Sequence, residues 1–460
     1  MLFTHMKNFF KSVAESLWGK FESKQEIRKF LSLAFIFFLL IGVYWALRPI
    51  KDSIFFATVG ANNLPWAKIF SAIFILPIIM FYSKIVEIFQ RNKVFYIMLT
   101  LYAIAALVFM ILFKHPTIGL ANKTVSSSRI IGWLWYWYIE SYGSLIIASF
   151  WVIVTDITLP ESAKRGFPLI YIFGQLGNFA GPYFITAKKL GFSTSAPIAG
   201  ICAALMICIA IMLWLFMKFT PKSQLKRYEG HETEAKNKKH KVGFLEGIKT
   251  IFTNGYLVGI LFVIMVFEII VTIFDFQFKL LVASAFPSEV GASAYLAKYA
   301  YTTGIVAFLC VTFGINSIQR KLGMFASLLI TPILVLGAVF LLWINPILGV
   351  AFWIMVLAKA VNYALNQPTI KNLYIPVKKS TRYKSMGWIE AFGGRSSKSI
   401  ASAVNLFRKI FITKHGAAGA MIFLTVSSSI SIGLIGIWLL VAFYLAKTHK
   451  KAITNNDVVC

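Results

Sequence analysis

Residues 30–53 read FLSLAFIFFLLIGVYWALRPIKDS, an apolar run from Phe30 to Leu47 followed at once by charges and a proline. About 20 apolar residues cross a bilayer, so the run predicts a membrane-spanning helix that ends near Leu47, before Pro49. The charges that follow have two interpretations: Arg48 and Lys51 either reach the lipid headgroups as anchors, or face protein and water as part of a site. Charged residues recur deep in later apolar segments, which favours the site.

The composition is that of a membrane protein. Of the 460 residues, 58% are hydrophobic and 14% are charged, whereas a soluble domain has about 25% charged residues. Hydropathy predicts an all-α integral membrane fold with twelve transmembrane helices, at Phe30–Leu47, Leu64–Glu87, Val94–Phe113, Ile130–Val154, Phe167–Ala187, Pro197–Phe219, Tyr256–Leu281, Ser293–Ser317, Met324–Trp343, Ile347–Leu365, Ile389–Ile412 and Ala417–Ala446.

The distribution of positive charge predicts the orientation. Lysine and arginine gather in alternate loops, which by the positive-inside rule places both termini in the cytoplasm of a multi-pass protein of the cell inner membrane. The long polar stretch near the middle divides the chain in two. The predicted parts are a cytoplasmic amphipathic segment at 1–29, a six-helix bundle at 30–219, a cytoplasmic linker at 220–250, a second six-helix bundle at 251–446 and a cytoplasmic tail at 447–460.

The formal net charge of +29 has two interpretations, one based on membrane topology and one based on function. Attraction to anionic headgroups is enough to explain the charges in the loops. The charges inside helices instead favour an electropositive route for an anionic substrate. No long basic run lies on a soluble domain, so nucleic-acid binding is not expected. The partners we expect are the lipid bilayer and a small anion.

The two halves look like repeats. Lys51 and Lys279 stand at the end of the first helix of each half, each with an acid within one turn, and Lys68 and Lys298 stand early in the second helix. The first pair is separated by 228 residues and the second by 230. Lys68 and Lys298 have no acid within one turn, so we interpret them as unpaired lysines suited to an anionic ligand. Parallel six-helix repeats with a site between them predict a major-facilitator-like transporter.

Two acids lie inside predicted helices. Glu140 shares a helical face with Tyr136 and Trp137, and Asp275 lies one turn before Lys279. An ionised carboxylate in the bilayer is costly unless it is paired or protonated. Glu140 is either one half of a structural salt bridge or a substrate, cation or proton site. Asp275 and Lys279 either neutralise each other as an i,i+4 pair or belong to a site.

The eleventh predicted helix carries Arg395 and Lys398 beside Gly393 and Gly394. Glycines allow close backbone approach, and the two cations offer hydrogen-bond donors to phosphate. The nucleotide-hydrolysing motif G-x-x-x-x-G-K-[ST] is absent. The four cysteines lack metal-ligand spacing, and the histidines fall in predicted loops or tails. We therefore expect no catalytic residues, no metal and no cofactor.

Six stretches of the chain resemble, in the same order, sequence motifs of the ATP/ADP translocases of plastids and obligate intracellular bacteria, the TLC nucleotide-transporter family. LRPIKDSI, from residue 47, is similar to the family's L-R-x-x-K-D-x-[LIV], and YIESYGSLIIASFW, from residue 138, to its Tyr, Glu, W-G-S and F-W pattern. The others are TIFDFQFKLLV, SAYLAKYAYTTGI, NYALNQPTIKNLYIP and IEAFGGRSSKS. The matches span nearly the whole chain.

The resemblance implies a carrier that exchanges ATP for ADP by alternating access without hydrolysis. We expect it to function as a monomer. The resemblance also implies that charged residues within several helices bind the substrate: Lys51, Glu140, Asp275 and Lys398, together with Arg48, Lys68, Lys279, Lys298 and Arg395. Tyr136 and Trp137 either serve packing and the interfacial aromatic belt or contact the nucleobase. Thr155, which stands in place of the family's Asn, is a third candidate for a base contact.

Other departures from the family's patterns keep two alternatives open. Asp275 replaces the usual Glu, and Asn366-Gln367 replaces the acid before Pro368. Such changes bear on the base recognised or on the coupling ion, so the first alternative is a proton-coupled importer of nucleotides or another phosphorylated organic anion. The second, of a different class, is a multi-pass membrane enzyme that acts on lipid-linked phosphates.

Overall fold

The structure, a computed structural model, describes residues 21–89, 91–225, 250–313, 315–378, 381, 385–386, 388–389, 393–455 and 457–459. The predicted amphipathic segment 1–29 lies outside these residues as far as residue 20. The predicted linker 220–250 lies outside them from 226 to 249.

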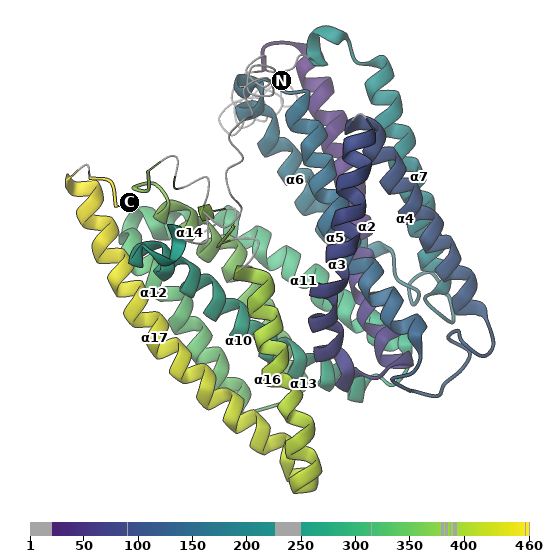
Figure 1. Cartoon of the computed structure of the whole chain (residues 1–460), viewed down its shortest axis with the longest axis vertical. Coiled ribbons are helices and arrows are strands. Elements are labelled where there is room, and N and C mark those ends of the chain that lie inside the picture. The colour runs from purple at the N-terminus through teal and green to yellow at the C-terminus, as the bar shows by residue number, and fades with distance from the viewer. Residues whose placement is uncertain are drawn as a thin grey trace, which may run out of the picture. The chain divides into compact units, whose positions relative to one another are not determined.

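Helices make up the regular structure of the described residues (Figure 1). In chain order they are α2 (Lys24–Thr58), η1 (Ala61–Asn63), α3 (Leu64–Ile88), α4 (Arg91–Lys114), α5 (Ile130–Asp156), α6 (Pro160–Phe184), α7 (Ala196–Phe219), η2 (Lys222–Leu225), α10 (Gly255–Ala285), α11 (Glu289–Phe313), α12 (Ile315–Ile344), α13 (Leu348–Val361), η3 (Asn362–Asn366, a π-helix), α14 (Gln367–Leu373), α16 (Gly394–His415), η5 (Gly416–Ala418) and α17 (Gly419–Asn455).

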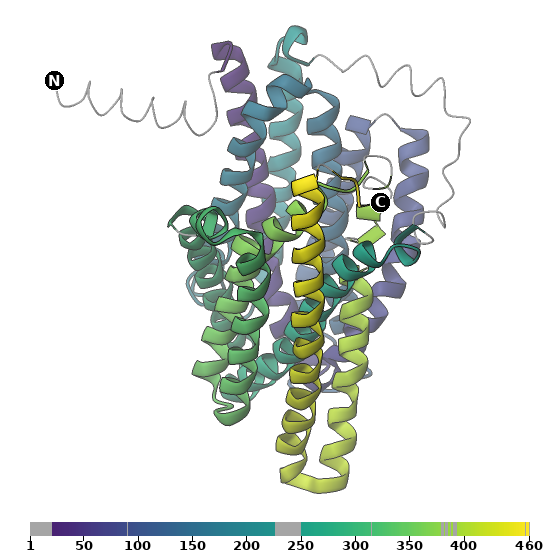
Figure 2. The ribbon, with the colours of Figure 1, turned by 90° about the vertical axis from the view of Figure 1, so that its left-hand side faces the viewer.

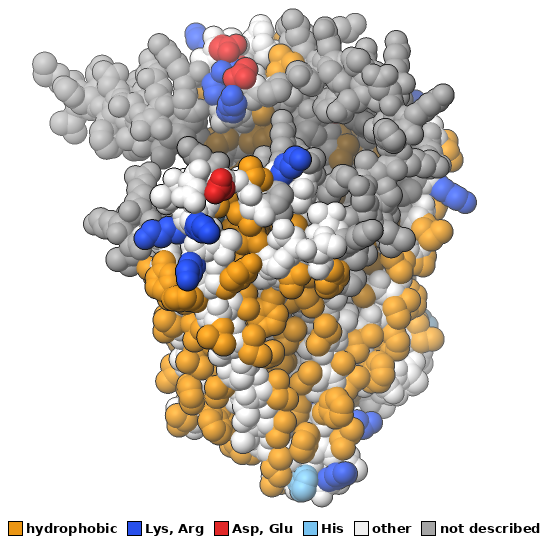
Figure 3. Space-filling model, turned by 60° about the vertical axis from the view of Figure 1, so that its left-hand side comes forward, with side chains coloured by type: hydrophobic (Ala, Val, Ile, Leu, Met, Phe, Trp, Pro, Cys, Tyr) orange, Lys and Arg blue, Asp and Glu red, His pale blue; other side chains and the backbone are white. Residues whose placement is uncertain are grey.

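The predicted all-α membrane fold is confirmed. Among the described residues, 9 helical stretches are long and apolar enough to cross a membrane, and one of them, 394–455, includes both α16 and α17. The more polar helices α6 and α11 are not among the 9, so the number of twelve crossings stays a prediction. Hydrophobic side chains cover much of the face shown in Figure 3, as expected of helices solvated by lipid tails; Leu440 of α17 is 72% exposed.

The chain divides into two compact units. Unit 1 comprises Met1–Thr58, Ile75–His240 and Ser288–Tyr301, and unit 2 comprises Val59–Phe74, Lys241–Pro287 and Thr302–Cys460. Each unit therefore includes a short segment from the other half of the sequence, at the start of α3 and of α11. In unit 2, α16 and α17 run antiparallel as a long hairpin (Figures 1 and 2).

Helix α2 does not end at Leu47, so the predicted end of the first helix is wrong. It continues through Pro49 to Thr58. A proline inside a helix removes a backbone hydrogen bond and costs about 3 kcal/mol or more. The residues after it offset that cost by packing, because Ile54 and Phe55 are fully buried. Lys51 and Asp52 consequently lie within a helix and have fixed directions.

Glycines let α2 and α6 pack with their backbones in contact. A Cβ atom on Gly181 of α6 would overlap the backbone of Gly42 of α2, and one on Gly177 would overlap the carbonyl oxygen of Phe38. Small residues at such crossings are typical of membrane helix pairs. This contact fixes the position of α2, the helix that carries Arg48 and Lys51.

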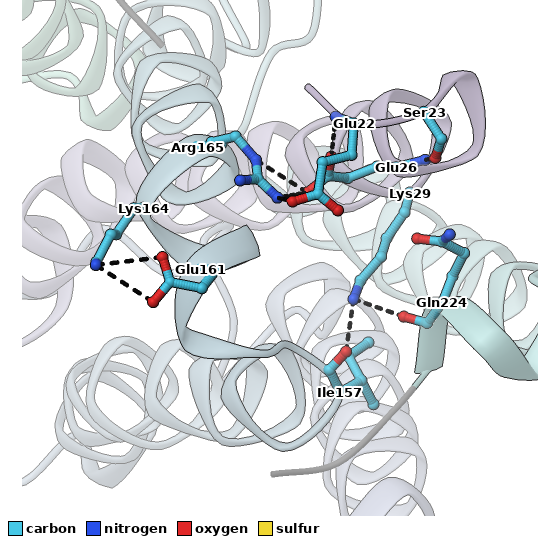
Figure 4. Close-up of polar contacts among 9 residues, drawn as sticks. All are labelled: Glu22, Ser23, Glu26, Lys29, Ile157, Glu161, Lys164, Arg165 and Gln224. Atoms are coloured by element: carbon cyan, nitrogen blue, oxygen red, sulfur yellow. Dashed lines mark hydrogen bonds and ion pairs between the residues drawn. The ribbon is translucent and has the colours of Figure 1, made fainter. Parts of the chain in front are cut away.

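The beginning of α2 is held by a group of charged residues (Figure 4). The buried ammonium of Lys29 donates hydrogen bonds to the carbonyl oxygens of Ile157 (2.5 Å) and Gln224 (2.7 Å). Arg165 of α6 donates to Glu26 at 2.9 Å and to Glu22 at 2.7 Å. Lys29 therefore ties the first helix to the ends of two others in unit 1.

We expect Lys29→Met to lower the free energy of unfolding by about 1–3 kcal/mol, since it leaves two carbonyl oxygens without a donor. The measurement is thermal unfolding of the purified protein in detergent. Lys164→Met is the matched control, because the Lys164–Glu161 pair is highly exposed (73% and 72%) and such pairs contribute at most about 1 kcal/mol. Equal losses of stability in the two variants would contradict the role given to Lys29.

Candidate functional site

The first charged cluster lies in unit 1, between α2 and α5. The ammonium of Lys51 donates to Oε1 of Glu140, lies 3.9 Å from Oδ1 of Asp52 and is 4.3 Å from the centre of the Tyr136 ring. Tyr136 and Glu140 are one turn apart on α5, so one helical face supplies both. The Lys51 side chain is 4% exposed, whereas that of Glu140 is 40% exposed. A buried cation is thus held by a carboxylate that still reaches open space.

Arg48 lies one turn before Lys51 on α2. Its guanidinium is 4.6 Å from the centre of the Trp45 ring and 5.7 Å from that of Tyr44. Aromatic faces attract cations, so these rings orient the guanidinium without neutralising it. Arg48 and Lys51 therefore place two cations on adjacent turns of one helix.

The second cluster lies in unit 2 and is built around Asp275 of α10. Its Oδ2 atom accepts a hydrogen bond from Lys68 of α3 at 3.0 Å and forms an ion pair with Lys279 of α10 at 3.1 Å. The three side chains are 14%, 15% and 9% exposed, in the order Asp275, Lys68, Lys279. The interpretation of Lys68 as an unpaired lysine is therefore wrong, because its partner comes from a helix 207 residues away in sequence.

Positive charge exceeds negative charge in this second cluster. A third lysine, Lys359 of α13, also interacts electrostatically with Asp275, so three lysines of the described part of the chain interact with this one carboxylate. Lys68 and Lys279 contact the same carboxylate oxygen, so their two ammonium groups lie close together. Charge interactions are strong where water is scarce. The arrangement favours a further anion, and a phosphate accepts hydrogen bonds from several donors at once.

The other predicted site residues lie on α5, α11 and α16. Lys298 on α11, and Arg395 and Lys398 at the start of α16, are exposed. The Thr155 hydroxyl donates to the carbonyl oxygen of Trp151 in its own helix at 2.8 Å. Trp137 packs against Trp133, with ring centres 5.8 Å apart. Their roles in binding stay predictions.

The charged residues Lys359 and Glu289 were not predicted as site residues from the sequence. Lys359 had a signal, since it stands inside the apolar segment predicted as the tenth helix. Glu289, at the start of α11, accepts from the Ser53 hydroxyl at 3.1 Å and from the Ser195 backbone N–H at 3.0 Å. Nothing in the local sequence marks Glu289, because both of its partners are distant.

Comparison with known proteins gives consistent results. A model of the TLC ATP/ADP transporter family matches residues 3–349. The ADP,ATP carrier protein 1 of Rickettsia typhi is 25% identical over 504 residues, which cover 98% of this chain and 99% of that protein. The ADP,ATP carrier protein 3 of Rickettsia bellii is 24% identical over 509 residues, which cover 97% of this chain and 99% of that protein.

Solved structures confirm the major-facilitator-like fold. The nucleoside transporter NupG has a TM-score of 0.63 at 13% identity, over 90% of this chain and 99% of that one. A peptide transporter of the POT family has a TM-score of 0.62 at 12% identity, over 91% and 95%. At these identities the likeness shows the fold alone. The family match and the full-length relatives go further: the chain is a multi-pass membrane protein that belongs to the TLC ATP/ADP transporter family.

Proposed function

We propose that this chain exchanges ATP for ADP across a membrane by alternating access, without hydrolysis. The observation that carries the proposal is the sharing of one Asp275 oxygen by Lys68 and Lys279 inside membrane helices. Two cations that share one acid are only partly neutralised, so the pair retains affinity for an incoming anion. The relatives are named ADP,ATP carriers, which supports nucleotides as the anions.

In the proposed mechanism the nucleotide phosphates take the place of the carboxylates. Before binding, Asp275 and Glu140 keep the buried lysines partly neutralised. A phosphate group then accepts hydrogen bonds from the lysines, which turn away from the acids. When the nucleotide leaves, the acids recover the lysines. No covalent bond forms or breaks, so the protein supplies binding and release only.

The adenine ring requires contacts of a different kind. We propose that Trp137 of α5 provides aromatic surface for it and that Thr155 contributes a polar contact. Tyr136, the other aromatic residue predicted to contact the base, is buried with its ring against Lys51. Arg48, Lys298, Arg395 and Lys398 supply further positive charge for the phosphates. The departure at Asn366 has a structural counterpart: its amide donates to the side chain of Asn362 at 2.9 Å, within the π-helix η3. Such π-helical turns often occur at functional sites.

The proposed setting follows the charge distribution. By this distribution both termini lie in the cytoplasm, in a protein that we place in the cell inner membrane. We further propose that one chain suffices for transport. The bundles at 30–219 and 251–446 are the two halves that alternate, joined by the linker at 220–250. We propose no catalytic residue.

The direct test is uptake of labelled ATP into ADP-loaded liposomes that contain the purified protein, with unlabelled ATP, ADP, GTP, CTP, UTP and NAD as competitors. We expect ATP and ADP to compete most strongly and the label to be recovered inside as intact ATP. Protein-free liposomes are the control. Release of labelled phosphate in step with uptake would instead support a membrane enzyme, and a lack of uptake would contradict nucleotide transport.

A further inference from the structure

A separate cavity lies in unit 2, on the other side of α10 from Asp275. The residues of α10 that line it include Gln277, Leu280, Leu281 and Ser284, whose spacing puts them on one helical face. Asp275 and Lys279 lie on the opposite face. The cavity has a volume of about 680 Å³, within the usual range for small-molecule sites. It is therefore distinct from the lysine–carboxylate cluster.

Two hydrogen-bond donors in side chains that line this cavity have no partner among the described residues. Nη1 of Arg408, on α16, donates to Oδ1 of Asn62 at 3.1 Å. Nε of Arg408 and Nε2 of Gln277 are both buried, and neither has a hydrogen-bond partner in the described parts of the chain. Buried polar groups in native proteins are nearly always paired. Arg408 and Gln277 both line the cavity, and an unpaired donor in each of these side chains indicates that an acceptor is supplied by a ligand.

The lining defines what that ligand is. Among the described residues that line the cavity, Arg408 carries the one formal charge and no acid is present. Much of the remaining wall is hydrocarbon, from Leu342, Ile412 and Leu424 with the leucines of α10. A guanidinium binds phosphate or carboxylate through parallel hydrogen bonds. We propose that the cavity binds an anionic lipid, with its phosphate or carboxylate on Arg408 and Gln277 and its hydrocarbon against the leucines.

The test measures binding of phosphatidylglycerol to the purified, delipidated protein by native mass spectrometry. Arg408→Gln is expected to lower the affinity by about tenfold or more, as loss of a charge-assisted hydrogen bond would. Lys409→Gln is the matched control, because it removes the same charge from the next position, which is exposed and does not line the cavity. Ala420→Phe, which fills the cavity from α17 and leaves Arg408 intact, is expected to lower the affinity as well.

Inorganic phosphate is titrated in parallel, because the anionic group bound by Arg408 could belong either to a lipid headgroup or to a free phosphate ion. Tight phosphatidylglycerol binding and weak phosphate binding, both dependent on Arg408, support the lipid. Tight binding of free phosphate that Arg408→Gln removes would overturn the lipid assignment in favour of a soluble anion. Equal lipid affinity in wild type and Arg408→Gln, or an equal loss in Lys409→Gln, would overturn the site. If Arg408→Gln does not fold, unchanged lipid affinity in Ala420→Phe decides against it. Nucleotide transport is not part of any readout.

Discussion

Lys51→Ala and Lys68→Ala are each expected to lower the affinity for ATP by about 1.5 kcal/mol or more, which is about tenfold. Each substitution removes one charge-assisted hydrogen bond to a phosphate oxygen. Neither should prevent folding. Glu140, the partner of Lys51, has a side chain that is 40% exposed and remains solvated, and Asp275 keeps Lys279 when Lys68 is removed.

The affinity is measured by ATP binding to the purified protein and by the substrate dependence of uptake in liposomes. Lys51→Arg should restore only part of the affinity, because a planar guanidinium does not reproduce a compact ammonium. Lys164→Ala is the control, since it removes an exposed, ion-paired lysine outside both clusters. Wild-type affinity in a well-folded Lys51→Ala or Lys68→Ala protein would refute that lysine's role.

Asp275→Asn is expected to act in the opposite direction on affinity. Without the shared carboxylate, Lys68 and Lys279 repel each other, and a bound phosphate relieves that repulsion. ATP should therefore bind more tightly, and its release should slow because no acid competes for the lysines. We expect the exchange rate to fall by more than about tenfold, the factor that corresponds to a difference of 1.4 kcal/mol.

Asp275→Glu is the matched variant, since it keeps the charge and resembles the family's usual residue. It should retain most of the exchange rate. The measurement is the maximal exchange rate beside the ATP dissociation constant, for purified proteins of equal stability. Weaker ATP binding in Asp275→Asn, or an unchanged exchange rate, would contradict the idea that the acid and the phosphate compete.

The membrane fold was predictable from the sequence because apolar runs report directly on lipid-facing helices. Each predicted segment overlaps a helix of the structure. The end of α2 was not predictable, because tertiary packing around Ile54 and Phe55 outweighs the local effect of Pro49. A helix boundary set by burial carries no local signal.

The candidate site was predictable in its residue types and only partly in its contacts. The Asp275–Lys279 pair was anticipated as an i,i+4 alternative, because helical spacing alone brings the two together. The contact between Lys68 and Asp275 joins helices from opposite halves of the sequence. A single sequence does not show which residues 207 positions apart come into contact. Arg408 and Gln277 escaped notice for the same reason, since only the folded chain places both at one cavity.

The exchange mechanism is tested most directly by uptake of labelled ATP into liposomes that contain ADP, compared with liposomes that contain none, with an inward proton gradient imposed on both. The account predicts that uptake requires internal ADP, is unaffected by a protonophore, and falls in both directions in Glu140→Gln. Strong inhibition by the protonophore, with no stimulation by internal ADP, would contradict exchange and support the proton-coupled importer.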